Sequence, residues 1–189
     1  GAGVIAITGG INAELNDITN SAYLIKIDHK TGDLSSEALP NMITSRYTHN
    51  MCYLNNYLYV LGGRYFGVGI LGVLNKCERF SFKNKAWEAI APLKDRRCTA
   101  NSISYNNKIY IMGGYKGDGR CKGIERYNEL KNEWEQIPLL LMNPIEAAGI
   151  LRLSYKEFIL VGGKDDFKEQ SYVQYYDLER GTFGKEKNL

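Results

Sequence analysis

The chain has 189 residues, of which 44% are hydrophobic, so it is long enough to bury a sizeable core. Its 24 basic and 21 acidic residues leave a net charge of +3, and the longest basic cluster is Arg96-Arg97, so nucleic-acid binding is not expected. No apolar run reaches the roughly 18 residues that cross a bilayer, which argues against membrane insertion. No basic stretch precedes the first apolar residues, so no signal peptide is expected, although a mature secreted fragment would look the same.

Four apolar runs that end in glycine pairs divide the chain into repeats. In chain order the pairs are Gly9-Gly10, Gly62-Gly63, Gly113-Gly114 and Gly162-Gly163. Their first glycines are 53, 51 and 49 residues apart. A period near 50 is typical of one four-stranded blade of a β-propeller.

Other positions keep the same register, which makes chance an unsatisfactory explanation. In each repeat an aromatic or apolar residue is followed seven positions later by another; the pairs are Ile27 and Leu34, Phe80 and Trp87, Tyr127 and Trp134, Tyr176 and Phe183. Sixteen residues before the glycines stand Arg46, Arg97 and Glu146, so Glu146 is interpreted as replacing arginine. Pro40, Pro92 and Pro138 follow the Trp position and predict a strand end there.

Each repeat predicts four short strands, and no window of ten residues predicts a helix. In the second repeat they cover about 47–54, 57–61, 77–82 and 86–90. Asn55-Asn56 and Asn106-Asn107 link the first two strands of the central repeats, since Asn tolerates the left-handed backbone of tight hairpins. The blades then cover 1–40 (a partial one), 41–91, 92–139 and 140–189, within a single domain.

The repeated residues have physical roles in such an array. A glycine pair permits positive φ and close backbone approach, and a bulky side chain at the Trp position fills the wedge between neighbouring sheets. One blade cannot bury both of its faces alone, so stacking creates the core.

These residues resemble the Kelch repeat. The resemblance covers nearly the whole chain and is most specific in Cys77-Glu78-Arg79-Phe80 and Ile124-Glu125-Arg126-Tyr127. Leu34 and Phe183 stand where the family has Trp. It implies structural roles for the glycine pairs, Arg46, Arg97, Phe80, Trp87, Tyr127, Trp134 and Tyr176. The fold expected is therefore all-β, a Kelch-type propeller of about four antiparallel four-stranded blades.

Kelch propellers usually close with about five to seven blades, most often six, which at about 50 residues each needs roughly 300 residues. We therefore expect this chain to be part of a larger, six-bladed propeller whose remaining blades come from the rest of the protein. A four-bladed ring closed by strand exchange is the alternative.

By resemblance, one face of the propeller gathers the loops at 11–21, 64–76, 115–122 and 164–170, with Leu139 to Met142 nearby. The stretch from Tyr65 to Leu74 is almost wholly apolar, where a solvated loop would be polar. The hypothesis is that this face docks a protein, with Tyr65 and Phe66 as anchors and Arg120 as a polar contact. The candidate residues are Arg64, Tyr65, Phe66, Val68, Ile70, Leu71, Tyr115, Lys116 and Arg120. In the alternative, the loop folds over its own or the neighbouring blade.

The sequence predicts no catalytic, cofactor or metal site. The stretch 67–72 matches GxGxxG, but a strand and not a helix follows it, so a dinucleotide site is not expected. His29 falls in a hairpin tip and His49 on an inner strand. Glu78 and Glu125 are equivalent positions of the repeat and not a facing pair. The four cysteines show no CxxC spacing and are expected to be buried thiols in a cytoplasmic protein.

Three functions remain open at this point. The first is a protein-interaction scaffold or adaptor, which the resemblance places among cytoskeletal and ciliary assemblies or ubiquitin-ligase substrate receptors. The second is a propeller enzyme of the oxidase, epimerase or lyase type, and the third is a carbohydrate-binding module. Fold does not fix function, so the first reading rests on analogy.

Overall fold

A computed structural model describes residues 3–12, 14, 16–66, 69–180, 182–183 and 187–188 of the chain. The described part is almost entirely β-structure, and the predicted fold class is confirmed. A single 3-10 turn, η1 (Gly69–Gly72), interrupts the strands described. Within these residues no helix is long and apolar enough to cross a membrane.

Four antiparallel sheets follow one another along the chain. The first has three strands, β1 (Gly3–Asn12), β2 (Asp17–Ile27) and β3 (Leu34–Leu39). The second has β4 (Asn50–Leu54), β5 (Tyr57–Leu61), β6 (Cys77–Ser81) and β7 (Ala86–Ile90). The third has β8 (Asn101–Tyr105), β9 (Lys108–Met112), β10 (Gly123–Asn128) and β11 (Glu133–Leu140). The fourth has β12 (Gly149–Arg152), β13 (Glu157–Val161) and β14 (Tyr172–Asp177), with β15 (Thr182–Phe183) and β16 (Lys187–Asn188) both pairing with β14.

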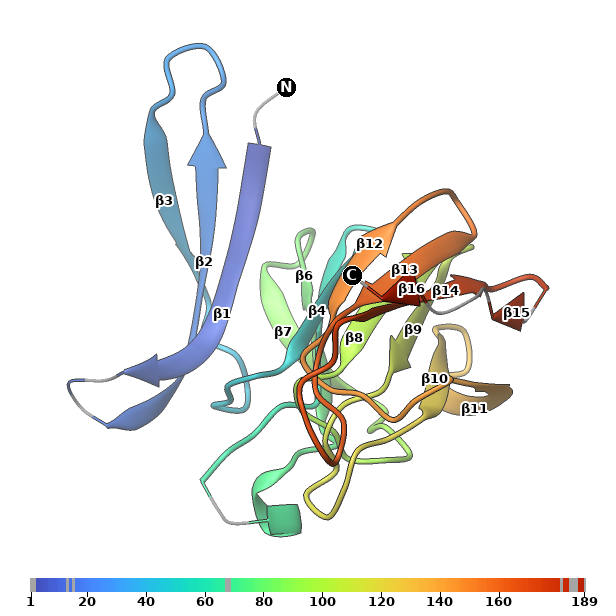
Figure 1. Cartoon of the computed structure of the whole chain (residues 1–189). Coiled ribbons are helices and arrows are strands. Elements are labelled where there is room, and N and C mark those ends of the chain that lie inside the picture. The colour runs from blue at the N-terminus through green and yellow to red at the C-terminus, as the bar shows by residue number, and fades with distance from the viewer. Residues whose placement is uncertain are drawn as a thin grey trace.

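The sheets stand side by side as the sectors of a propeller do. Strands β4, β8 and β12 open their sheets and neighbour one another in space, so they form the inner side of the array. The first sheet, blue in Figure 1, stands at one side of the molecule. The β1–β2 hairpin and η1 lie toward the lower side of Figure 1, whereas the β2–β3 and β12–β13 hairpins lie toward the upper side.

The core lies between neighbouring sheets. One cluster of buried apolar side chains joins the second and third sheets, and another joins the third and fourth. Trp134, only 1% exposed, packs on Tyr127 at the first of these junctions and donates its indole N–H to the carbonyl of Ala91 at 3.0 Å. Trp87 makes the equivalent bond to the carbonyl of Pro40 at 2.7 Å. Each tryptophan thus bonds to the connection that precedes its own sheet.

Hydrogen bonds also link the sheets along their inner side. The amide of Thr99 donates to the carbonyl of Thr48 at 2.9 Å, and the amide of Ala147 donates to the carbonyl of Thr99 at 2.8 Å. Beside this backbone ladder, two equivalent asparagines reach the next sheet. Asn50 donates to Ala100 O at 2.6 Å, and Asn101 donates to Ala148 O at 2.7 Å. Gly149 occupies the equivalent position of the fourth sheet, so the asparagine contact is not repeated there.

Two expectations about local structure are wrong. The segment 11–21 is not a loop, because β1 continues through the glycines to Asn12 and β2 begins at Asp17. A β-bulge between Thr8 and Gly10 accommodates the glycine pair, so β1 and β2 stay paired almost to the turn. Pro138 does not end its strand, since β11 runs to Leu140. Pro138 lies on an edge strand, beside a shift in the pairing register with β10. Proline has no N–H to donate, and at this position no hydrogen bond of the ladder requires one.

Candidate partner-binding face

In the second, third and fourth sheets, the connection from the second to the third strand and the segment that leads into the sheet lie on one side of the molecule, here called the loop face (Figure 1). The glycine pairs set its geometry. Gly62 and Gly113 have φ of 60° and 64°, and a Cβ on them would lie 2.3 and 2.5 Å from a carbonyl oxygen of the next sheet. The following glycines donate to those same carbonyls, as Gly63 N does to Arg97 O at 2.9 Å. Each loop therefore leaves its sheet at a fixed point beside the next one.

Beneath the loop face, two buried ion pairs hold the strand ends. Arg97 and Glu125 lie 2.6 Å apart, and both side chains are almost fully buried. Glu125 also accepts from the backbone amides of Lys94 and Asp95, and Arg97 donates to two carbonyls. The second sheet repeats the arrangement with Arg46 and Glu78, also 2.6 Å apart. These carboxylates are saturated with internal donors, which makes them structural groups.

In the fourth sheet the ion pair is absent, and the expectation that Glu146 stands at the arginine position is wrong. Ile145 occupies the arginine position. Its carbonyl accepts the amide of Gly114, as the carbonyl of Arg97 accepts the amide of Gly63. The starts of β12 and β13 are eight residues apart, whereas the equivalent strands of the second and third sheets start seven residues apart, so the spacing is shifted by one. Gln174 replaces the glutamate.

In the fourth sheet, neutral side chains provide hydrogen bonds where the second and third sheets use the buried ion pair. The Tyr176 hydroxyl donates to Gln174 Oε1 at 2.5 Å and accepts the amide of Met142 at 3.2 Å. Met142 corresponds to Lys94, whose amide goes to the Glu125 carboxylate in the third sheet. Both charges are thus replaced together, which avoids leaving a single buried charge.

Glu146 instead joins a network that spans two sheets at the loop face. It accepts from the Thr99 hydroxyl at 2.6 Å and from the Arg120 guanidinium. Arg120 also pairs with Asp166 at 3.0 Å. The residue that we expected to contact a partner is therefore engaged by two carboxylates of the fourth sheet.

The apolar connection of the second sheet is tied at both ends and presents its side chains outward. Tyr65 N donates to Gly72 O at 3.0 Å, and Leu74 N donates to Gly63 O at 2.8 Å. Tyr65, Phe66 and Leu71 are 44%, 53% and 81% exposed, and the two rings meet edge to face at 5.3 Å. Val68 lies outside the described residues, and of Ile70 only the backbone, in η1, is described. Three of the candidate residues, including both predicted anchors, are thus exposed on this connection.

Tyr115 and Arg64 lie at the junction of the second and third sheets. Each follows the glycine pair of its sheet and forms an isolated bridge with the lead-in segment. The guanidinium of Arg64 lies 6.0 Å from the centre of the Tyr115 ring, and that of Arg120 lies 5.7 Å from it. Lys116 follows in the same loop, and its amide closes a turn with Gly119 O at 2.9 Å. The loops of adjacent sheets therefore meet at this ring.

One exposed aromatic residue of the loop face, Phe167, was not singled out from the sequence. Phe167 is 93% exposed at the tip of the fourth loop, where Asp165 accepts the amides of Phe167 and Lys168. The sequence did carry a signal for this residue, because it is the aromatic residue of a short polar loop. Of the nearby Leu139 to Met142, Leu141 is buried in the core between the third and fourth sheets.

The groups most able to carry chemistry are buried or lie away from the loop face. Within the described ranges no cluster of His, Cys, Asp or Glu could hold a metal. All four cysteines are buried and free, and burial raises the pKa of Cys52 to about 11 and of Cys77 to about 12. His49 bonds to the Thr8 hydroxyl at 2.7 Å, and burial, with the charge of Arg46, lowers its pKa to about 4.

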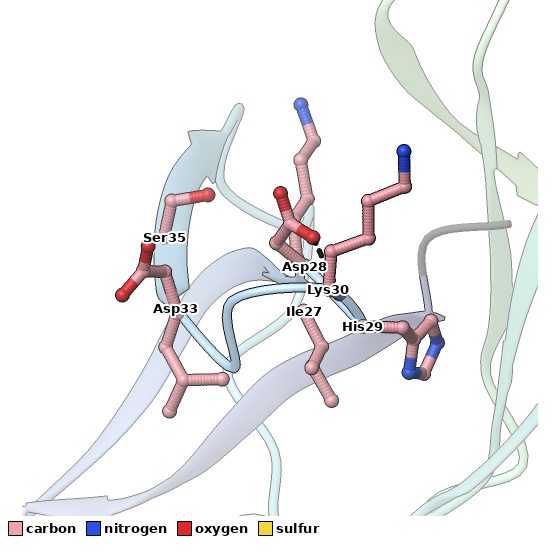
Figure 2. Close-up of a pocket in the computed structure, with 8 residues that line it drawn as sticks. Ile27, Asp28, His29, Lys30, Asp33 and Ser35 are labelled. Atoms are coloured by element: carbon pink, nitrogen blue, oxygen red, sulfur yellow. Dashed lines mark hydrogen bonds between the residues drawn. The ribbon is translucent and has the colours of Figure 1, made fainter.

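A pocket of about 560 Å³ lies at the β2–β3 hairpin, away from the loop face. In Figure 2, His29 points to the opposite side from Asp33 and Ser35. The Asp28 carboxylate accepts the amide of Lys30 at 2.8 Å, which closes the hairpin tip. The pocket is thus the hollow of a single hairpin, and it brings together no reactive groups from different sheets.

Comparison with known proteins agrees with this architecture. The KLHDC2/KLHL20/DRC7 Kelch-repeats domain matches residues 2–187. Kelch-like protein 36 of Rattus norvegicus is 28% identical over 154 residues, covering 77% of this chain and 23% of that protein. Kelch-like protein 38 of Homo sapiens is 27% identical over 154 residues, which is 79% of this chain and 26% of the relative.

Kelch-like protein 23 of Mus musculus is 26% identical over 183 residues, covering 95% of this chain and 30% of that protein. The chain thus covers between 23% and 30% of the length of these three relatives. The repeat register, the four antiparallel sheets and the match over nearly all residues lead to one conclusion: the chain belongs to the KLHDC2/KLHL20/DRC7 Kelch-repeats domain family.

Proposed function

We propose that this chain is part of a protein-interaction scaffold or adaptor that binds its partner on the loop face, chiefly through the connection at 64–74. The exposure of Tyr65, Phe66 and Leu71 on a connection that is hydrogen-bonded at both ends carries the proposal. Aromatic side chains held in place before binding lose little conformational freedom when a partner covers them, so they are good anchors.

The burial pattern of this connection favours docking over the alternative in which the loop covers its own sheet. Val73, only 2% exposed, supplies the contact with the protein interior, and the three exposed residues before it do not. Phe167 adds a further exposed ring on the loop face. Such exposed apolar groups are typical of an interaction surface.

The family gives a context for the partner. We propose that the remaining blades come from the rest of the protein, since the Kelch-like relatives are several times longer than this chain. Cytoskeletal, ciliary and ubiquitin-ligase assemblies are the candidate settings, and the exposed apolar side chains of the loop face support a role as substrate receptor. A cytoplasmic location belongs to the same proposal.

Affinity purification with quantitative mass spectrometry tests the proposal. The double variant Tyr65→Ser, Phe66→Ser should lose specific partners while its thermal unfolding midpoint stays close to that of the parent chain. The matched control is Leu130→Ser, Tyr155→Ser, which removes two exposed apolar side chains on hairpins away from the loop face.

A partner retained by the control variant and lost by the loop variant would then be purified and its binding measured directly. Loss of folding in the loop variant would instead support the self-packed loop. Equal retention of every partner by both variants would show that the loop face is not the docking surface.

A further inference from the structure

Neighbouring sheets also meet at their outer strands, and a carboxylate fills one of these junctions. Between the second and third sheets, Glu129 accepts from the Tyr59 hydroxyl at 3.2 Å and from the Arg79 guanidinium at 2.8 Å. Arg79 also pairs with Glu88 at 2.6 Å. The Arg79 guanidinium therefore contacts two carboxylates, one from its own sheet and one from the next.

The junction of the third and fourth sheets repeats these groups except for the carboxylate of the next sheet. The equivalent residues, counted from the glycine pairs and the Trp positions, are Tyr110, Arg126 and Glu135. Leu178 stands where the third sheet has Glu129, two residues after the aromatic position of the strand. Among the described residues, Glu135 at 2.7 Å is then the only carboxylate within ion-pairing distance of Arg126, whose buried Nε has no hydrogen-bond partner.

A pocket of about 270 Å³ opens where that carboxylate is missing. Tyr110 and Arg126 line it together with an apolar wall that includes Ile137, Leu139 and Leu178. A guanidinium and apolar surface are thus combined in one small cavity. Such a combination suits an anion that also carries an apolar group.

The other charged groups of the pocket do not fill the missing position. Glu179 lines the pocket, but its carboxylate accepts from the Tyr105 hydroxyl at 2.9 Å and pairs with Lys156 at 3.3 Å. Arg180 also lines the pocket; its side chain is 75% exposed, and its nearest carboxylate is that of Asp177 at 3.9 Å. Arg180 therefore adds a second, weakly paired guanidinium.

Tyr110 offers a hydrogen-bond donor beside Arg126. The residue is 6% exposed, and burial raises the pKa of its phenol, which therefore keeps its proton at neutral pH. At the filled junction the equivalent hydroxyl of Tyr59 donates to Glu129. The same donor is thus available to an anion that enters the pocket.

We propose that the pocket between the third and fourth sheets binds a small organic carboxylate that carries a short apolar group. The carboxylate accepts hydrogen bonds from Tyr110 and Arg126, in the place that Glu129 takes at the other junction. The apolar group packs on Leu178. The site shares no residue with the loop face, so it goes beyond the proposed function. Because pockets for drug-sized molecules begin at about 300 Å³, this one selects a smaller ligand.

A carboxylate fits the pocket better than a phosphate does. Glu135 pairs with Arg126, Asp177 lies beside Arg180, and Glu179 lines the pocket, so further negative charge is repelled. A phosphate brings close to two negative charges at neutral pH, whereas a carboxylate brings one. One carboxylate is also what the repeat itself places at the filled junction.

Titration of the chain with benzoate, followed by two-dimensional NMR of the backbone amides, tests the proposal. Shifts should concentrate at Tyr110, Arg126 and Leu178, and the dissociation constant should be at or below about 1 mM, as expected for a ligand of this size. Benzamide, which has the same ring but no charge, should bind at least about tenfold more weakly. Inorganic phosphate should not displace benzoate.

Two variants and a matched control locate the site. Leu178→Glu should place an internal carboxylate in the pocket and abolish benzoate binding, with a thermal unfolding midpoint within about 4 °C of the parent chain. Arg126→Gln should lower benzoate affinity at least about tenfold. The control, Leu130→Glu, makes the same substitution on the equivalent hairpin of the third sheet, at a side chain that is 99% exposed, and should leave the affinity within about twofold.

Three results would overturn the proposal: amide shifts away from the pocket, equal affinities for benzamide and benzoate, or benzoate bound by Leu178→Glu as tightly as by the parent chain. Displacement of benzoate by phosphate would overturn the assignment to a carboxylate. The shift map and the benzamide comparison need no substitution, so they remain decisive if a variant does not fold. Tyr65→Ser, Phe66→Ser should bind benzoate normally, which separates this site from the loop face.

Discussion

Exchanging the buried ion pair of the third sheet for the neutral pair of the fourth tests how the array is held together. Arg97→Ile alone leaves the Glu125 carboxylate buried with only backbone amides as donors. Glu125→Gln alone leaves the buried Arg97 guanidinium with only the partly exposed Asp95, 3.8 Å away, as its counter-charge. The double variant recreates the Ile145 and Gln174 arrangement, in which neither charge is present.

The expected magnitudes follow from the burial of both partners. Removing one member of a buried pair costs about 3–5 kcal/mol, so the two single losses sum to roughly 6–10 kcal/mol. The double variant loses the pair but buries no isolated charge, and it should cost about 2–4 kcal/mol for backbone groups that lose strong partners. The coupling energy should therefore be at least about 2 kcal/mol.

Denaturant unfolding of the parent chain, both single variants and the double variant measures this coupling. The matched control is the same cycle on Arg126 and Glu135, a pair 2.7 Å apart whose side chains are each about a third exposed. That cycle should give less than about 1 kcal/mol, because solvent screens the pair. Additive losses for Arg97 and Glu125, with a coupling below about 0.5 kcal/mol, would refute the reasoning.

Two further predictions concern the glycine pairs and the buried histidine. Gly113→Ala should destabilise the chain by about 2 kcal/mol in denaturant unfolding, because φ is 64° and the new Cβ would meet the Ile145 carbonyl at 2.5 Å. Gly119→Ala, which meets nothing within 4 Å, should be neutral or slightly stabilising, and equal losses would contradict the argument. The pKa of His49 is lowered from 6.5 to about 4, so the unfolded state binds the proton more readily and stability should fall by up to about 3 kcal/mol as pH drops through that window. Unfolding midpoints measured from pH 7 to pH 4 should show this loss in His29→Gln and not in His49→Gln, and identical profiles would count against it.

The features that repeat in every sheet could be predicted from the sequence. Glycine pairs and the aromatic positions seven residues apart recur because each sheet must solve the same packing problem. The spacing therefore gave the strands and the stacking without knowledge of any long-range contact. The candidate residues Tyr65, Phe66 and Leu71 stood out in the sequence because an apolar loop contrasts with its polar equivalents, and the structure places all three at the surface.

What could not be predicted depends on contacts between repeats or on irregular spacing. Counting sixteen residues back from Gly162 led to Glu146, because the longer β12–β13 connection cannot be recognised before the strands are known. Arg120 looked available, because its partners Glu146 and Asp166 lie 26 and 46 residues further along the chain.

The ladder along the inner side has a consequence for how the molecule opens. Thr48, Thr99 and Ala147 each belong to a different sheet, and the bonds among them run from one sheet to the next. Local fluctuations then separate neighbours one junction at a time, without a single concerted transition. Amide hydrogen exchange at Thr99 and Ala147 reports the opening of two separate junctions, and the slower of the two identifies the stronger one.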